Sequence, residues 1–249
     1  MMDMKVEICV ENIESALNAQ NAGADRIELC SNLVEGGTTP SYGTIASVRD
    51  KLTIDINVII RPRSGDFIYS DLEYDIMRRE IDICGECGIN GIVLGILLSE
   101  GSVDVDRTAK LIESARPMSV TFHRAFDMCS DPVLGLKDVI YSGADRLLTS
   151  GQKENAREGA ELIRDLIVQA NDKIIIMPGG GITESNIEWI ARNTGAKEFH
   201  STCRTVVDGE MIFRKQGISM GNGPDSMEFS RKIADPEKIK NIINILRGI

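Results

Sequence analysis

The chain has 249 residues, of which 42% are hydrophobic and 27% charged, a balance that is typical of a globular protein and excludes wholesale disorder. The net charge is −10 and no block of lysine or arginine stands out, so nucleic acid is not an expected partner. No apolar run approaches the roughly 18–20 residues of a membrane span, and no secretion signal is visible at the N-terminus. We therefore expect a cytoplasmic protein that does not bind membranes, with free thiols at its six cysteines.

Short apolar, β-branched runs alternate with amphipathic stretches from one end of the chain to the other. The expected strands are residues 6–10, 26–30, 56–61, 91–97, 119–126, 146–149, 173–177 and 197–201, each followed by an expected helix. Strand alternating with helix predicts parallel pairing through crossovers, and eight units in about 250 residues match a closed barrel. We predict a single (β/α)₈ TIM barrel over residues 1–249; a doubly wound open sheet fits eight evenly spaced units less well.

Residues 202–234 interrupt this rhythm with a long segment that is rich in glycine and methionine. Long segments inside compact domains tend to be functional lids or mobile loops. Since this one leaves the last expected strand at the barrel mouth, we predict a lid over the site. An exposed excursion with a purely structural role is the alternative.

Strand alternation indicates which ionisable side chains face the barrel lumen. Residues that face the helices must be apolar, so the intervening polar residues point inward. The predicted inward set is Glu7, Glu28, Arg61, Arg63, His123, Asp127, Glu198 and His200, and it includes both histidines of the chain. A barrel built only for stability would carry branched apolar side chains there. The set favours a functional pocket, with a satisfied salt-bridge network as the structural alternative.

Polar and glycine-rich motifs follow several expected strands, at the barrel end where TIM-barrel enzymes carry their sites. Glycines after the seventh strand could turn backbone N–H groups toward an anion. The predicted ligand-binding residues are Arg61, Arg63, Asp66, Arg124, Ser150, Gly179, Gly180, Gly181, His200 and Ser201. The predicted acid–base residues are Glu7, Glu28, His123 and Asp127.

Cys9 and Cys30 are expected on the lumen side of two neighbouring strands. Two soft thiolates close together could hold Cu(I), whereas ordinary core cysteines would need no further explanation. Both interpretations remain open from the residues alone.

Several strings of residues closely resemble the CutC family, which is named for copper homeostasis. They are EIC at 7–9, RIELC at 26–30, EGGTTPS at 35–41, IIRPRSGDF at 59–67, VTFHRAFD at 120–127, LTSGQ at 148–152 and HS at 200–201. The resemblance implies a TIM barrel, a cytoplasmic location, a homo-oligomer (most simply a dimer) and a role in copper handling. Cysteine is expected at Cys9 and Cys30 in the family pattern, whereas no catalytic triad comes with the resemblance.

Two functions of different classes follow. The first is copper handling, in which Cys9 and Cys30 bind Cu(I) as the one expected cofactor. The second is an enzyme of the lyase, isomerase or hydrolase type, acting on a small anionic or polyhydroxylated substrate. In that case Arg61 and Arg63 would clamp the anion, because the arginine fork suits carboxylate or phosphate.

Overall fold

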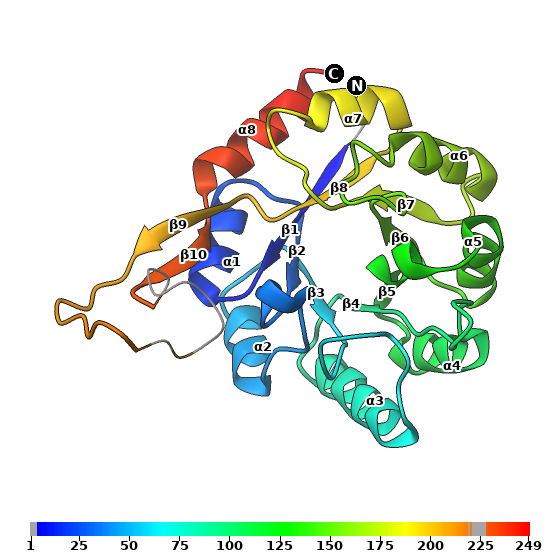
Figure 1. Cartoon of the computed structure of the whole chain (residues 1–249), viewed down its shortest axis with the longest axis horizontal. Helices are drawn as coiled ribbons and strands as arrows, with labels where there is room; N and C mark the ends of the chain where they lie inside the picture. The colour runs from blue at the N-terminus through cyan, green and yellow to red at the C-terminus, as the bar shows by residue number, and fades with distance from the viewer. Residues whose placement is uncertain (1–3, 219, 221–227) are drawn as a thin grey trace.

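The computed structural model describes residues 4–218, 220 and 228–249, and it forms a nearly closed barrel of parallel strands surrounded by helices (Figure 1). The strands are β1 Lys5–Val10, β2 Arg26–Leu29, β3 Asp55–Ile59, β4 Gly91–Leu94, β5 Ser119–Phe122, β6 Arg146–Thr149, β7 Ile175–Pro178 and β8 Glu198–Ser201. Their hydrogen-bonded order is β7-β6-β5-β4-β3-β2-β1-β8, and β7 and β8 lie next to each other where the barrel closes. The predicted TIM barrel is confirmed.

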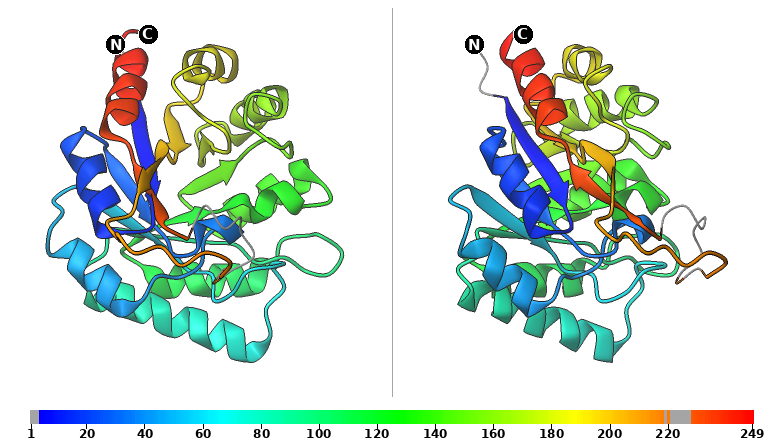
Figure 2. Two further views of the ribbon diagram at one scale, coloured as in Figure 1. Left: turned by 60° about the vertical axis from the view of Figure 1, so that its left-hand side comes forward. Right: turned by 90° about the vertical axis from the view of Figure 1, so that its left-hand side faces the viewer.

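One helix or more follows each barrel strand and covers the outside of the barrel (Figure 2). The α-helices are α1 Ile13–Asn21, α2 Tyr42–Arg49, α3 Asp71–Glu86, α4 Val105–Ala115, α5 Pro132–Tyr141, α6 Ala160–Ala170, α7 Ile187–Thr194 and α8 Pro236–Arg247. Short 3₁₀ helices occupy Leu33–Glu35 (η1) and Arg124–Met128 (η2). No helix in the described ranges is both long and apolar enough to cross a membrane.

Local chemistry sets the helix ends. Ser70 and Glu73 form a reciprocal capping box at the start of α3. Asp131 and Asp235 cap α5 and α8, each followed by proline in the first turn, where the missing N–H has no intrahelical acceptor to lose. These caps fix where each helix leaves its loop, and the loops at the carboxyl ends of the strands carry the polar motifs.

The described part of the segment 202–234 forms an arm at the side of the barrel. Strands β9 Arg204–Asp208 and β10 Ser230–Ala234 pair antiparallel and project outward beside α1 (Figures 1 and 2). The backbone of Ala234 is bound to α1 by the side chains of Ser15 and Asn18. Residues 219 and 221–227 lie outside the described residues, so the lid stays a prediction.

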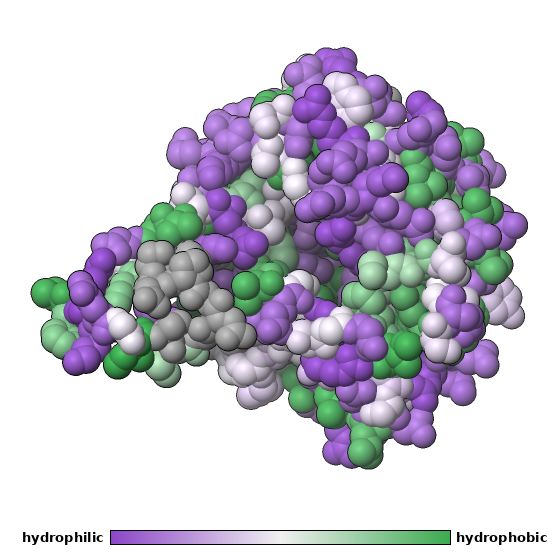
Figure 3. Space-filling model, in the orientation of Figure 1, coloured by the Kyte–Doolittle hydropathy of each residue, from purple (hydrophilic) through white to green (hydrophobic). Residues whose placement is uncertain are grey.

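The outer part of the arm exposes apolar side chains among hydrophilic ones (Figure 3). Its exposed side chains include Met211, Ile212 and Phe213, and Ile212 is 99% exposed. Exposed apolar residues grouped in this way are typical of surfaces that contact other molecules. The homo-oligomer expected from the sequence stays a prediction.

A network of buried ion pairs fills the part of the lumen near the strand starts, which we call the lower lumen; the upper lumen lies toward the strand ends. Arg26 on β2 donates through Nε to Glu7 on β1 at 2.5 Å and through Nη2 to Glu198 on β8 at 2.8 Å. Arg146 on β6 donates through Nε to the same Glu198 oxygen at 2.7 Å. Asn57 on β3 donates to Glu7 at 3.1 Å. Two guanidinium groups and two carboxylates thus neutralise one another, which offsets the cost of burying each charge.

Removing one partner from this network should be strongly destabilising. We expect Arg26→Met to lower the free energy of unfolding by about 3–5 kcal/mol, because Glu7 and Glu198 would lose their shared cation in a buried site. Urea unfolding measures the loss. Arg192→Met is the matched control, since Arg192 pairs with Glu188 on an exposed helix face and should change stability by about 0.5 kcal/mol or less. Equal losses in the two variants would contradict a structural role for the buried network.

Candidate functional site

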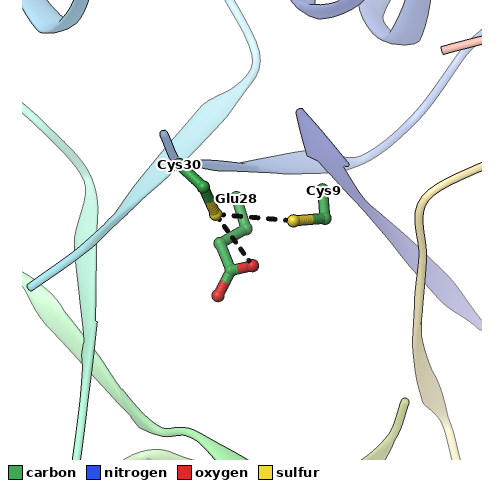
Figure 4. A group of neighbouring side chains, drawn as sticks. All are labelled: Cys9, Glu28 and Cys30. Atoms are coloured by element: carbon green, nitrogen blue, oxygen red, sulfur yellow. Dashed lines mark hydrogen bonds between the residues drawn. The ribbon is translucent and has the colours of Figure 1, made fainter. Parts of the chain in front are cut away.

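Two cysteine side chains meet inside the barrel above the ion network. Cys9 on β1 lies opposite Glu28 of β2 in the strand register, and Cys30 follows the end of β2. The Sγ atoms of Cys9 and Cys30 are 3.4 Å apart, and the Cys30 thiol is also 3.4 Å from Oε2 of Glu28 (Figure 4). Both thiols are buried and free. The predicted inward orientation of all three side chains is therefore confirmed.

His200 on β8 links these thiols to the ion network below. Its Nδ1 lies 2.8 Å from Oε1 of Glu7, and its Nε2 lies 3.7 Å from Oε2 of Glu28. Glu7 is thus shared between His200 and Arg26. One ligand atom from each of Cys9, Glu28 and Cys30 lies within 4.8 Å of the others, and the same holds for Glu7, Glu28 and His200.

The charges of these groups favour an imidazolium and a thiolate in close contact. Burial opposes charge on His200, but Glu28 and hydrogen bonds to Cys9 and Glu7 raise its pKa well above the usual range. The hydrogen bond with Cys30 lowers the pKa of Cys9 to about 5, and His200 acts in the same direction. A thiolate is therefore the form of Cys9 at neutral pH, and thiolates rather than thiols bind metals.

The neighbouring acids behave differently from one another. Burial raises the pKa of Glu28 and of Cys30 well above their usual ranges, and the neighbouring Cys9 acts in the same direction on both. Burial acts in the same sense on Glu7, but Arg26 and His200 outweigh it and lower the pKa of that carboxyl. The three glutamates of the lumen thus differ in their partners, because Glu7 and Glu198 are paired with arginine and Glu28 lies beside His200.

Apolar side chains and a glycine turn enclose the thiols. Ile59 of β3 and Val93 of β4 pack against both cysteines, with Leu33 of η1 against the same cluster. Gly37 has a φ of 91°, and a Cβ there would lie 3.4 Å from the Cys30 sulfur. A residue with a side chain at this position would crowd the thiol, so the turn from η1 into the next segment needs glycine.

The predicted residue His123 is buried at the end of β5, away from the thiol pair. Its Nδ1 accepts a hydrogen bond of 3.2 Å from the backbone N–H of Ala125, and its Nε2 has no partner. Burial, together with the nearby charge of Arg61, lowers its pKa to about 3. His123 is therefore neutral, in contrast to His200.

The inward orientation predicted for Arg63 is wrong, and Asp66 lies outside the lumen as well. Strand β3 ends at Ile59, so alternation no longer applies at these positions. The Arg63 side chain is 37% exposed and binds Glu73 and Asp66 at the surface. Arg61 alone remains buried, with its guanidinium held by backbone carbonyls of the neighbouring loops.

Asp127 is also not a lumen residue, because η2 replaces the predicted continuation of β5. Its carboxylate accepts hydrogen bonds from the backbone N–H groups of Ser150 and Gln152 and from the hydroxyl of Thr149. Arg124 binds both Asp127 and the Ser150 hydroxyl. These hydrogen bonds hold η2 against the loop after β6. Both carboxylate oxygens of Asp127 have hydrogen-bond partners, so its role in this arrangement is structural.

The glycine turn after β7 is closely packed. A Cβ at Gly179 would lie 2.5 Å from Leu148, and one at Gly180 would lie 3.3 Å from the Arg124 guanidinium. A Cβ at Gly181 would lie 2.9 Å from Asn155. The hydroxyl of Ser201 donates to the backbone carbonyl of Ile182. Close packing thus accounts for these glycines, and their predicted role in binding an anion stays a prediction.

Three lumen residues were missed by the sequence reasoning: Arg26, Asn57 and Arg146. A signal for Arg26 and Asn57 was available, because both have the inward parity of their strands. The predicted carboxylates also required buried cations as partners, which points to arginines at the strand starts.

Comparison with known proteins assigns the chain to a family. The CutC family model matches residues 4–205. A family protein CutC of Parabacteroides distasonis is 46% identical over 239 residues, which cover 96% of this chain and 98% of that protein. The human copper homeostasis protein cutC homolog is 44% identical, over 98% of this chain and 89% of its own length.

Solved structures agree with this assignment. A putative copper homeostasis protein CutC from Streptococcus agalactiae superposes with a TM-score of 0.76 at 37% identity, covering 80% of this chain and 98% of that one. Phosphoribosylanthranilate isomerase from Thermotoga maritima has a TM-score of 0.58 at 14% identity, and shares the fold alone. On this sequence identity, extending over nearly its full length, the chain belongs to the CutC family.

Proposed function

We propose that this protein handles copper by binding Cu(I) between Cys9 and Cys30. The observation that carries the proposal is the pair of buried thiols 3.4 Å apart on adjacent strands, one of them with a pKa of about 5. Soft thiolates are preferred ligands of Cu(I). The name of the human relative, copper homeostasis protein cutC homolog, points to the same role.

The donor set suits Cu(I) better than Zn²⁺. Structural zinc is almost always four-coordinate. Here one nitrogen of His200 is bound to Glu7 and the ring is protonated, so His200 would have to lose a proton before it could complete a tetrahedral site. Two buried thiolates form a soft ligand pair of the kind that Cu(I) prefers.

The charge balance supports the same choice. Two thiolates and one Cu(I) ion carry a net charge of −1, which the His200 imidazolium beside them offsets. Only the proton of Cys30 has to leave when the ion binds, since the pKa of Cys9 is already low.

The thiols must stay reduced for this function. Six free cysteines and the contact between Cys9 and Cys30 fit a reducing compartment, such as the cytoplasm expected from the sequence. A disulfide between these two residues would remove both ligands.

Serine substitution tests the ligand pair. We expect Cys9→Ser and Cys30→Ser each to abolish tight one-to-one Cu(I) binding, because a hydroxyl is a poor ligand for a soft ion. Anaerobic competition with a chromophoric Cu(I) chelator measures the affinity. Cys84→Ser is the control, since Cys84 is a buried thiol on α3 outside the lumen, and its variant should bind as the unmodified protein does. Unchanged affinity in a Cys9/Cys30 double variant would refute the site.

The histidine charge states can be observed directly, because the chain contains only two histidines. A raised pKa keeps His200 protonated at pH 7, and a lowered pKa of about 3 keeps His123 neutral over the same range. In ¹⁵N-histidine NMR spectra we expect one charged ring and one neutral ring with the proton on Nε2 from pH 7 down to about pH 4. His200→Gln identifies the charged ring. Titration of either ring near pH 6.5 would contradict these assignments.

The glycine turn over the thiols supplies a further test. Gly37→Ala places a Cβ 3.4 Å from the Cys30 sulfur and 3.3 Å from Ile59, so we expect weaker Cu(I) binding. Gly88→Ala is the matched control, because Gly88 also has a positive φ, 68°, but no atom within 4 Å of the added Cβ. Both variants should lose about 1 kcal/mol of stability from backbone strain. An equal loss of copper affinity in the two variants would show that the turn does not act on the thiol.

A further inference from the structure

Arg61 is a buried cation that forms no ion pair in the described part of the chain, and the exposed carboxylate of Glu35 interacts with it only at longer range. Its Nη1 donates to the backbone carbonyls of Glu35 and Gly37 at 2.9 and 2.7 Å, and its Nη2 donates to the carbonyl of Gly65 at 2.9 Å. These three neutral acceptors fix the orientation of the guanidinium but do not neutralise it. Gly36, Gly37 and Gly65 all have positive φ, a backbone conformation that favours glycine. In this conformation the two loops present their carbonyls to Arg61, and we call this set of carbonyls the cradle.

The three hydrogen bonds of the cradle use only part of the five N–H donors of Arg61. Its Nε–H is buried and has no acceptor, although a buried, unpaired donor costs about 1–3 kcal/mol and an unpaired charge costs more. Arg146 of the ion network also has a buried nitrogen, Nη1, without a partner, but Arg146 and Arg26 each contact a carboxylate, which Arg61 does not. The position of Arg61 therefore requires an explanation beyond stability.

His123 presents a second unused donor near Arg61. Because Nδ1 accepts the hydrogen bond from Ala125, the proton of the neutral ring lies on Nε2, which is buried and has no partner. The ring of Phe67 packs against His123 with a centroid distance of 5.1 Å, and the Arg61 guanidinium lies 5.1 Å from the same ring. The two donors without acceptors, Nε of Arg61 and Nε2 of His123, thus belong to side chains that contact the Phe67 ring at the ends of β3 and β5. We call this region the cationic wall.

Gly95, which follows β4 between these two strands, makes this wall possible. A Cβ at Gly95 would lie 2.5 Å from Nδ1 of His123, so any side chain there would displace the imidazole. Ile59 of β3 and Val93 of β4 pack against Cys9 and Cys30, whereas the rings that pack against His123 are those of Phe67 and Phe122. The wall therefore has its own chemistry: a fixed cation, a neutral N–H donor and an aromatic face.

We propose that Arg61 and His123 bind the carboxylate group of a small organic acid beside the Phe67 ring. A carboxylate carries the single negative charge that one guanidinium balances, and it accepts hydrogen bonds from both Nε of Arg61 and Nε2 of His123. A phosphate dianion would require a second cation, but Arg63 is turned away to Glu73 and Asp66. This site shares no ligand atom with the Cys9 and Cys30 pair, although Gly37 lies next to both Arg61 and the Cys30 side chain.

The experiment uses copper-free, full-length protein labelled with ¹⁵N-histidine. Acetate, glycolate, pyruvate and benzoate are titrated at constant ionic strength and pH 7, and inorganic phosphate is titrated in parallel. We expect at least one carboxylate to shift the His123 Nε2–H signal saturably, with the His200 signals unchanged. Arg61→Gln should weaken that binding by about tenfold or more, because it removes a charge-assisted hydrogen bond.

Arg63→Gln is the matched control, since Arg63 lies two residues away and faces the surface, and it should change the affinity by less than about twofold. The titration of the unmodified protein decides the question even if Arg61→Gln does not fold. The site is refuted if none of the four carboxylates shifts His123, or if the shift persists unchanged in Arg61→Gln. Tighter binding of phosphate than of every carboxylate would overturn the assigned ligand class.

Discussion

The contact between Arg26 and Glu7 is the interaction on which the rest of the lumen depends. Arg26 keeps Glu7 ionised, and the Glu7 carboxylate in turn orients the His200 ring and favours its protonated form. The charged imidazole then stabilises a thiolate at Cys9. Charge alternates along this path from guanidinium to carboxylate to imidazolium to thiolate, so each buried ion is compensated by the next. Without Arg26, Glu7 and His200 would lose the charges that stabilise the Cys9 thiolate.

The register of the parallel strands places these charged groups next to one another in the lumen. Cys9 lies opposite Glu28, and Glu7 lies opposite His200 on the other side of β1. Because inward residues recur every second position, three adjacent strands place sulfur, carboxylate and imidazole at one level of the barrel. Arg61 and His123 follow β3 and β5, further round the barrel on the side of β2, and Ile59 and Val93 pack on the thiol cluster. An anionic thiol site and a cationic wall thus coexist in one small lumen.

Sequence periodicity predicted the barrel, and the inward orientation of Glu7, Cys9, Glu28 and His200, because these residues lie within regular strands or directly after one. The same rule failed at Arg63 and Asp127. Alternation has meaning only while the backbone stays extended, and β3 ends before the first of these residues whereas η2 includes the second. Strand ends are the boundaries that local sequence determines least, since the hydrogen bonds that end a strand come from distant loops. Asp127, for example, is held by the loop after β6.

The sequence left open whether the polar lumen is functional or only a satisfied network, and the structure shows features of both. Near the strand starts the carboxylates of Glu7 and Glu198 are paired with arginines, as a stable barrel requires, although Nη1 of Arg146 and Oδ1 of Asn57 have no partner there. In the upper lumen, stability alone would have removed the unpaired donors of Arg61 and His123 and replaced the close thiols by apolar side chains. A protein retains groups that cost stability where they perform a task. The ion pairs of Glu7 and Glu198 therefore stabilise the barrel. Ligands should be sought at the level of the two thiols, Arg61 and His123.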